Sequence, residues 1–277
     1  MNKSKTLFPP WQLNNWRQVD DSVRGGSSVS HLKSFGAQFN LGGEVSYREK
    51  SSNSSVDHPQ AVEFSGMLDI NTLGGAGFAS QKFTYNPILT LPCKHYSGIR
   101  LQLLADENDE KTSPKPKEFT FTIATTPSKR MPNGRTASRV IWEANFQAPI
   151  GNVVGGEGAS DSANIILPFS SFIATYRGRP VPPYGVARLE ASSVTLGDDV
   201  GEEDRDLAAE VVYQDGGGAE VGTTAFFHTE HIFEVGLMCR SGFGKQAGVF
   251  SLRIMDIEAM VKLEDISIVP SNRMGRS

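Results

Sequence analysis

The chain has 277 residues, of which 38% are hydrophobic and 21% charged, and its formal net charge is −4. This composition suits a globular protein, and the length fits one large β domain or two small ones. An acidic chain has no bulk electrostatic attraction for nucleic acid or for an anionic membrane surface, so neither is an expected partner. No stretch has the apolar length that a transmembrane helix needs.

The first ten residues and the cysteines bear on the compartment. The N-terminal sequence lacks the apolar core of a secretory signal and the Arg-rich amphipathic helix of a mitochondrial presequence, and Pro9 and Pro10 would end a helix early. Cys93 and Cys239 are too few for a typical chain of an oxidising compartment, so we expect reduced thiols in strands. A cytoplasmic location is therefore expected in preference to a mitochondrial one.

Apolar and polar residues alternate through much of the chain, which is the pattern of half-buried β-strands. After Ile254 the apolar phase shifts, so we expect a β-bulge near Met255 and Asp256. Helix signals are few, and residues 207–213 fit a short helix or a strand. Many strands without βαβ spacing predict an all-β sandwich of two packed antiparallel sheets. The apolar positions expected to face the core include Val62, Phe64, Leu68, Ile99, Leu101, Leu103, Phe119, Phe121, Ile123, Val140, Trp142, Ala144, Phe146, Phe233, Val235, Leu237, Cys239, Phe250, Leu252, Ile254, Ile257, Ala259 and Val261.

Several polar segments interrupt the strand pattern and are interpreted as surface loops. Residues 51–58 are serine-rich, residues 106–117 are charged, and residues 127–139 are basic with proline and glycine. A fourth segment, residues 197–222, begins acidic and ends in glycines. The alternative for this acidic segment is a lid or a partner-binding loop, a role that long loops on rigid sandwiches sometimes have.

The sequence WRQVDDSVRGGSS at residues 16–28 resembles the opening signature of the complex I intermediate-associated protein 30 family. Further family landmarks follow in the same order, and the match runs from about residue 16 to residue 257. They are FSG (64–66), GGAGFAS (74–80), YSGIRL (96–101), LPF (167–169), RGR (177–179), GLM (236–238) and GVFSLRI (248–254).

This resemblance implies a galactose-binding-like jelly roll with long loop insertions, similar in architecture to carbohydrate-binding modules. We expect one jelly-roll domain over residues 16–265, with an N-terminal extension (1–15) and a C-terminal tail (266–277). The best-known members of the family are mitochondrial chaperones that help to assemble respiratory complex I. The absence of a convincing presequence here puts that mitochondrial role in question.

The signature segment contains the densest polar cluster of the chain, and Asp20, Asp21, Arg24 and Ser27 are the candidate ligand-binding residues within it. Two carboxylates, a guanidinium and a glycine backbone can cradle a polar ligand. The alternative is that the carboxylates cap a turn and Arg24 forms an internal ion pair. Trp16, next to the cluster, fits either stacking on a ligand or packing in the core.

Other motifs give weaker signals. Arg177 lies in a basic turn that fits an anion site or a plain surface loop. The glycine-rich segment 74–77 is not a dinucleotide-binding motif, because residues 78–80 do not supply the motif's last glycine and no helix is expected to follow. His228 and His231 would face opposite sides of a strand. The sequence therefore predicts no cofactor and no metal site. A structural calcium is compatible with this kind of jelly roll, but its ligands cannot be placed.

The leading functional hypothesis is a non-catalytic binding or assembly-chaperone-type protein that offers its concave face or loops to a protein partner or a small-molecule ligand. The alternative is a cofactor-independent enzyme, an isomerase or cyclase of the pericyclase type, acting on a small hydrophobic metabolite. A carbohydrate-binding module is third. An assembly factor should expose an apolar patch, whereas an enzyme should have a deep pocket. The sequence does not set the oligomeric state.

Overall fold

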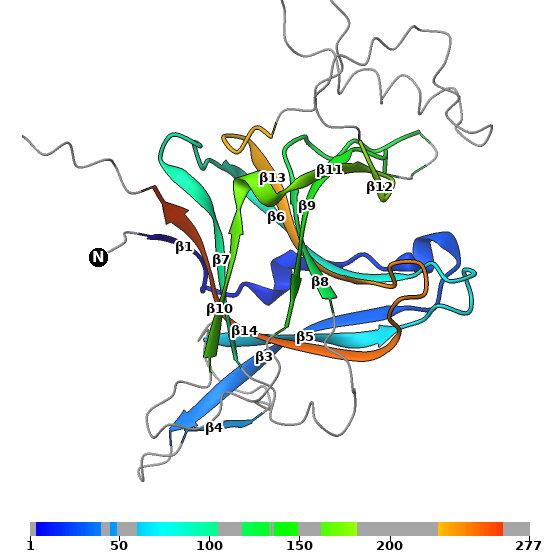
Figure 1. The fold of residues 1–277 in the computed structure, drawn as a ribbon, viewed down its shortest axis with the longest axis horizontal. Helices are drawn as coiled ribbons and strands as arrows, with labels where there is room; N and C mark the ends of the chain where they lie inside the picture. Colours follow the sequence, from blue (N-terminus) through cyan, green and yellow to red (C-terminus); the bar gives the residue numbers. More distant parts are fainter. Residues whose placement is uncertain are drawn as a thin grey trace, which may run out of the picture.

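The structure is a computed structural model that describes residues 4–39, 45–48, 60–104, 118–132, 134, 136–148, 162–181 and 227–262. The strands of these residues form two antiparallel sheets, which confirms the predicted all-β jelly-roll sandwich (Figure 1). The loops predicted at residues 51–58, 106–117 and 197–222, and the helix or strand at 207–213, lie outside the described residues.

Sheet A has seven strands. In spatial order they are β10 (Ser162–Pro168), β7 (Tyr96–Leu104), β14 (Gly248–Val261), β5 (Ala61–Leu68), β3 (Val29–Phe39) and β4 (Val45–Arg48), and β1 (Ser4–Phe8) pairs with β14.

Sheet B also has seven strands. In spatial order they are β12 (Arg179–Pro180), β11 (Ile173–Tyr176), β9 (Val140–Gln147), β8 (Glu118–Ala124), β13 (Ile232–Arg240), β6 (Phe78–Leu89) and β2 (Trp16–Gln18). The helices of the described residues are three 3₁₀ turns, namely η1 (Leu13–Asn15), η2 (Asp21–Arg24) and η3 (Phe169–Ser171).

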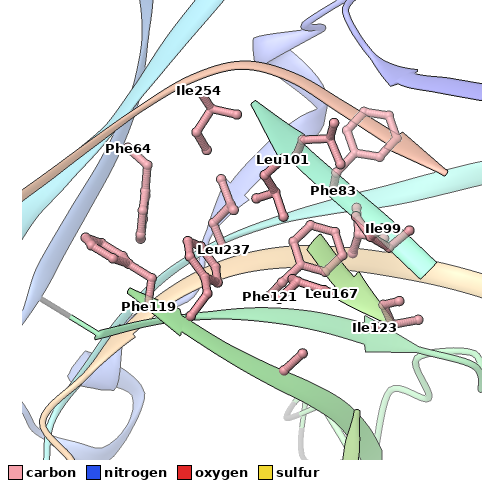
Figure 2. Close-up of a cluster of buried hydrophobic side chains, with 14 of the residues drawn as sticks. Phe64, Phe83, Ile99, Leu101, Phe119, Phe121, Ile123, Leu167, Leu237 and Ile254 are labelled. Atoms are coloured by element: carbon pink, nitrogen blue, oxygen red, sulfur yellow. The ribbon is translucent and has the colours of Figure 1, made fainter. Parts of the chain in front are cut away.

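The core fills the space between the sheets. Figure 2 shows Phe64, Leu101 and Ile254 of sheet A meeting side chains of sheet B. Phe121 and Leu237 are among these sheet B residues, and both are fully buried. Each side chain of this size contributes about 1.5–3 kcal/mol when it is removed from water.

The period-two alternation thus identified most inward positions of the central strands. It was wrong for Phe233 and Val261, which are half-buried and outside the core. The pairing register shifts beside each of them, and Ile232 is the buried residue in place of Phe233.

The predicted bulge is present in β14. The pairing register between β14 and β7 shifts between Ile254 and Asp256, so the inward positions change from Ile254 to Ile257. The indole N–H of Trp11 donates a hydrogen bond to the carbonyl oxygen of Met255 at 3.2 Å. The bulge is therefore confirmed, and a residue of the N-terminal segment satisfies its freed backbone carbonyl.

Residues 4–15, which belong to the segment that we expected to be an N-terminal extension, contribute to the sandwich. β1 pairs with β14, and Phe8 and Trp11 are buried with their rings stacked at 4.9 Å between centroids. The cysteines are both free, but only one lies where it was expected. Cys239 is buried in β13, whereas the prediction of a strand was wrong for Cys93, which is exposed in the turn between β6 and β7.

Asp256, beside the bulge, shares one arginine with Glu258. The Arg100 Nη2 atom lies 2.7 Å from Glu258 Oε2 and 3.5 Å from Asp256 Oδ1. Burial raises the pKa of Asp256, and Glu258 raises it further, although Arg100 acts in the opposite direction. A raised pKa means that the folded state binds this proton more tightly than the unfolded chain. The ionised carboxylate therefore costs stability, and this cost disappears as the pH falls through the folded pKa.

We expect Asp256→Asn to raise the free energy of unfolding at pH 7 by up to about 1 kcal/mol, because it removes this cost. Urea unfolding at pH 7 and at pH 4 measures the gain, which should shrink at the lower pH. The control is Glu258→Gln, which loses the shorter ion pair to Arg100 and should not stabilise the fold. A stability loss for Asp256→Asn that is equal at both pH values would contradict the expected sign.

Candidate functional site

The acidic pair of the signature segment lies between the two sheets. Asp20 is buried just before η2, and its carboxylate accepts hydrogen bonds from the backbone N–H and hydroxyl of Ser30, at 2.8 and 2.6 Å. It also accepts from the backbone N–H of Ser80 at 2.7 Å and from the side-chain amide of Gln18. Because Ser30 is in β3 and Ser80 is in β6, one carboxylate ties sheet A to sheet B.

Asp21 makes a second link of the same kind. Its carboxylate accepts hydrogen bonds from the backbone N–H and hydroxyl of Ser28, at 2.9 and 2.6 Å, and from the N–H of Phe78, at 3.2 Å. A Cβ atom at Gly26 would lie 2.3 Å from Asp21 Cγ, so this glycine of the signature is needed for close packing. We call Asp20 and Asp21 the carboxylate clamp. All four of its oxygens have partners within the fold, and ligand binding by these residues stays a prediction.

Arg24 and Ser27 are exposed next to the clamp. The Arg24 guanidinium lies 5.8 Å from the ring centroid of Phe78, and the Ser27 hydroxyl is 3.1 Å from the hydroxyl of Thr72. In Figure 1 this loop and the turns β5–β6 and β13–β14 gather at one end of the sandwich. These two residues are the solvent-facing part of the predicted cluster.

Trp16 and Arg177 lie apart from the clamp and from each other. Trp16 is buried in β2, and its ring packs against Phe8 and Phe83 at 5.2 and 5.7 Å. Arg177 is in the turn between β11 and β12, at the opposite edge of sheet B, where its Nε donates to the Ser138 hydroxyl at 3.1 Å. The structure thus does not gather the six predicted site residues into one place.

The outer face of sheet B carries a charged group that the sequence analysis did not find. Glu234 in β13 is buried, yet it lies on the face opposite to Val235, which points into the core. Its carboxylate lies 2.9 Å from Arg139 Nη2 and 3.4 Å from Lys82 Nζ, and it pairs with the guanidinium of Arg17. We call these four residues the Glu234 cluster. They come from β2, β6, β13 and the segment before β9, so no local sequence motif indicates them.

The electrostatics of the Glu234 cluster follow from burial and from an excess of cations. Burial acts to raise the pKa of Glu234, but Lys82, Arg139 and Arg17 together outweigh it and lower this pKa. Burial lowers the pKa of Lys82; Glu234 opposes this shift, while Arg139 and Arg17 add to it. The carboxylate therefore stays ionised, and Lys82 releases its proton more readily than an exposed lysine.

Further polar side chains share this outer face. Arg240 Nη1 lies 2.6 Å from Glu143 Oε2, and its Nη2 donates to the side-chain oxygen of Asn145 at 3.0 Å. Gly236 faces Lys82 and Thr122 across the strands, and a Cβ atom there would lie 2.6 Å from the Thr122 hydroxyl. The absent side chain leaves room for the stem of Lys82. Fixed cations and hydroxyls of this kind can hold an anionic group.

The outer face of sheet A exposes apolar side chains at the end nearest the clamp. Val29, Met67 and Val249 are direct cross-strand neighbours on β3, β5 and β14, with 39%, 47% and 63% of each residue exposed. We call these three residues the apolar row. Phe243, in the turn that leads into β14, is 87% exposed. Ser241 holds that turn by donating from its N–H to Gly77 and from its hydroxyl to Gly75, both at 2.9 Å.

Among the residues that the structure describes, no helix is long and apolar enough to cross a membrane. The same residues contain no group of three His, Cys, Asp or Glu side chains arranged to hold a metal ion.

Two comparisons place the chain among known proteins. An uncharacterized protein of Schizosaccharomyces pombe is 32% identical to it over 185 residues, which is 67% of each chain. The profile of the family described as Complex I intermediate-associated protein 30 (CIA30) matches residues 5–203, a span that contains the carboxylate clamp and the three cations of the Glu234 cluster. The chain therefore belongs to the complex I intermediate-associated protein 30 family.

Proposed function

We propose that this protein is a non-catalytic binding protein of the assembly-chaperone type, which holds a protein partner on the apolar row and on Phe243. The family is named for its association with intermediates of complex I, so an assembling respiratory complex is the class of partner that we propose. The observation that carries the proposal is the exposed apolar surface at one end of sheet A.

The apolar row is distinct from the rest of its face. The next rung of the same face consists of His31, Ser65 and Ser251, and the rung after it is charged, with Glu63 in its centre. If this outer face contacted only solvent, we would expect its last rung to be polar like the two rungs beside it. Covering the apolar row with a partner would gain roughly 25 cal/mol for each Å² of apolar surface removed from water.

Phe243 has the properties of an anchor for such a partner. Its ring gains nothing from the fold, because 87% of the residue is exposed. Its backbone has a φ of 59°, a left-handed conformation that is uncommon for a bulky residue. Aromatic side chains often dominate the binding energy of protein interfaces when a partner covers them.

Affinity purification of the full chain from its own cells tests this proposal. We expect Phe243→Ser combined with Met67→Ser to reduce the recovery of respiratory-complex subunits or their assembly factors at least tenfold. Both positions are exposed, so the unfolding free energy should change by no more than about 0.5 kcal/mol for each substitution.

The matched control is Ile173→Ser, which removes an apolar residue of similar exposure (57%) from β11 on the other sheet. This control should recover the same partners as the wild type. Equal recovery by the double variant and the control would contradict the proposed surface, and recovery of no such subunits by the wild type would contradict the proposed partner class.

A further inference from the structure

The Glu234 cluster holds more positive charge than its own carboxylate neutralises. Arg17, Lys82 and Arg139 surround one glutamate, and among the described residues no other carboxylate lies within ion-pair distance of these three cations. The group therefore has two formal positive charges in excess, on a chain whose net charge is −4.

An ion-pair network that only stabilises the fold does not need this excess. One carboxylate is satisfied by one or two cations, and a third adds repulsion between like charges in a partly desolvated place. Burial is the largest cause that lowers the pKa of Lys82, and the like charges of Arg139 and Arg17 lower it further. An anion bound beside Lys82 would remove the repulsion.

The exposure of the three cations shows where such an anion would enter. The side chain of Arg139 is 11% exposed and that of Lys82 22%, whereas that of Arg17 is 49% exposed. The cluster is thus closed at Arg139 and open to solvent at Arg17. Lys82 lies between them, with its ammonium at a loose 3.4 Å from Glu234 and N–H donors to spare.

We propose that the Glu234 cluster is a binding site for a phosphate group of a small molecule, held by Arg17 and Lys82. Arg139 donates to Glu234 and to the carbonyl oxygen of Thr126, so it contributes positive charge rather than a direct contact. A phosphate dianion matches the excess of two positive charges. The planar guanidinium of Arg17 and the ammonium of Lys82 are donor types that proteins commonly use for phosphate. Glu234 pairs with all three cations and so fixes their positions. This site is on the sheet opposite the apolar row, so it is independent of the proposed protein-binding surface.

The test is the binding of inorganic phosphate to the full chain, measured by calorimetry and by the shift of the thermal unfolding temperature at constant ionic strength. We expect phosphate to raise the unfolding temperature of the wild type, because a ligand that binds only the folded state stabilises it. Lys82→Met keeps most of the stem that packs on Gly236 but removes the charge, and it should weaken phosphate binding at least tenfold. Arg17→Gln, at the exposed side, should weaken it severalfold.

Lys245→Met is the matched control, since it removes the same charge from an exposed turn away from the Glu234 cluster. It should bind phosphate as the wild type does. Equal weakening by Lys245→Met, or an unchanged affinity in both Lys82→Met and Arg17→Gln, would overturn the proposal. A preference for citrate over phosphate by tenfold or more would also overturn it and would assign the cluster to carboxylate ligands.

Discussion

Asp20→Ala is expected to destabilise the fold by about 3–5 kcal/mol, a large part of the stability of a typical domain. The substitution leaves the buried backbone N–H groups of Ser30 and Ser80 without the carboxylate acceptor, and it removes one of the links between β3 and β6. An unsatisfied buried donor costs about 1–3 kcal/mol, and hydrogen bonds to a charged acceptor are the stronger kind. Urea unfolding of the full chain measures the loss.

Arg24→Ala is the control for this prediction, because Arg24 lies in the same loop but is exposed, with its guanidinium 5.8 Å from the ring centroid of Phe78. It should cost no more than about 1 kcal/mol. If Asp20→Ala unfolds at the same urea concentration as the wild type, the hydrogen bonds of Asp20 between the two sheets do not stabilise the fold, and the prediction is wrong. If Arg24→Ala loses binding of a ligand while its stability is unchanged, the exposed side of the signature segment is a binding site.

Glu234→Ala is expected to cost about 3–5 kcal/mol, because it leaves three partly buried cations without their shared counter-charge. Two features separate this effect from simple loss of packing. First, high salt should recover part of the stability by screening the repulsion among the cations. Second, adding Lys82→Met to Glu234→Ala should recover part of it, since the pair interacts directly.

The pH dependence of this contribution has a definite sign. The pKa of Glu234 is lowered in the folded state, so its contribution is complete above the unfolded value of 4.5 and is lost as the pH falls through the folded pKa. The difference in unfolding free energy between the wild type and Glu234→Ala should therefore shrink on acidification. A difference that stays constant with both pH and salt would contradict the electrostatic origin.

The central strands could be predicted from the sequence because their signal is local. Ile99, Leu101 and Leu103 alternate with polar residues and all three are buried, and the phase change after Ile254 marked a real bulge. β1 could not be predicted in this way. It has only five residues, and its place depends on pairing with β14 at the other end of the chain.

The polar cluster of the signature segment could be predicted from the sequence, but the burial of its carboxylates could not. Its carboxylates drew attention as a polar cluster, whereas their burial depends on serines that face inward. In β3 the alternation is inverted, because Ser30 is buried and Val29 is exposed. The hydrogen bonds of Asp20 to Ser30 require this register, and the same register places Val29 in the apolar row. Ser28 and Ser30, two positions apart and shortly after Asp20 and Asp21, are the sequence signal that could have indicated the clamp.

The Glu234 cluster had no comparable signal. Arg17, Lys82, Arg139 and Glu234 are each separated by more than fifty residues along the chain, and only the strand order brings them together. A single glutamate in an apolar strand was the one visible hint, since such a residue on a largely covered sheet needs a partner.

The proposed role as a binding protein is tested most directly by the size of the complex that the chain forms in cell extract. Size-exclusion chromatography of the wild type should place most of the chain in a complex much larger than the monomer. The Phe243→Ser, Met67→Ser double variant should shift to the free chain, while Ile173→Ser should not. Elution of the wild type as the free chain, or of the double variant in the same large complex, would contradict a protein partner on the apolar row.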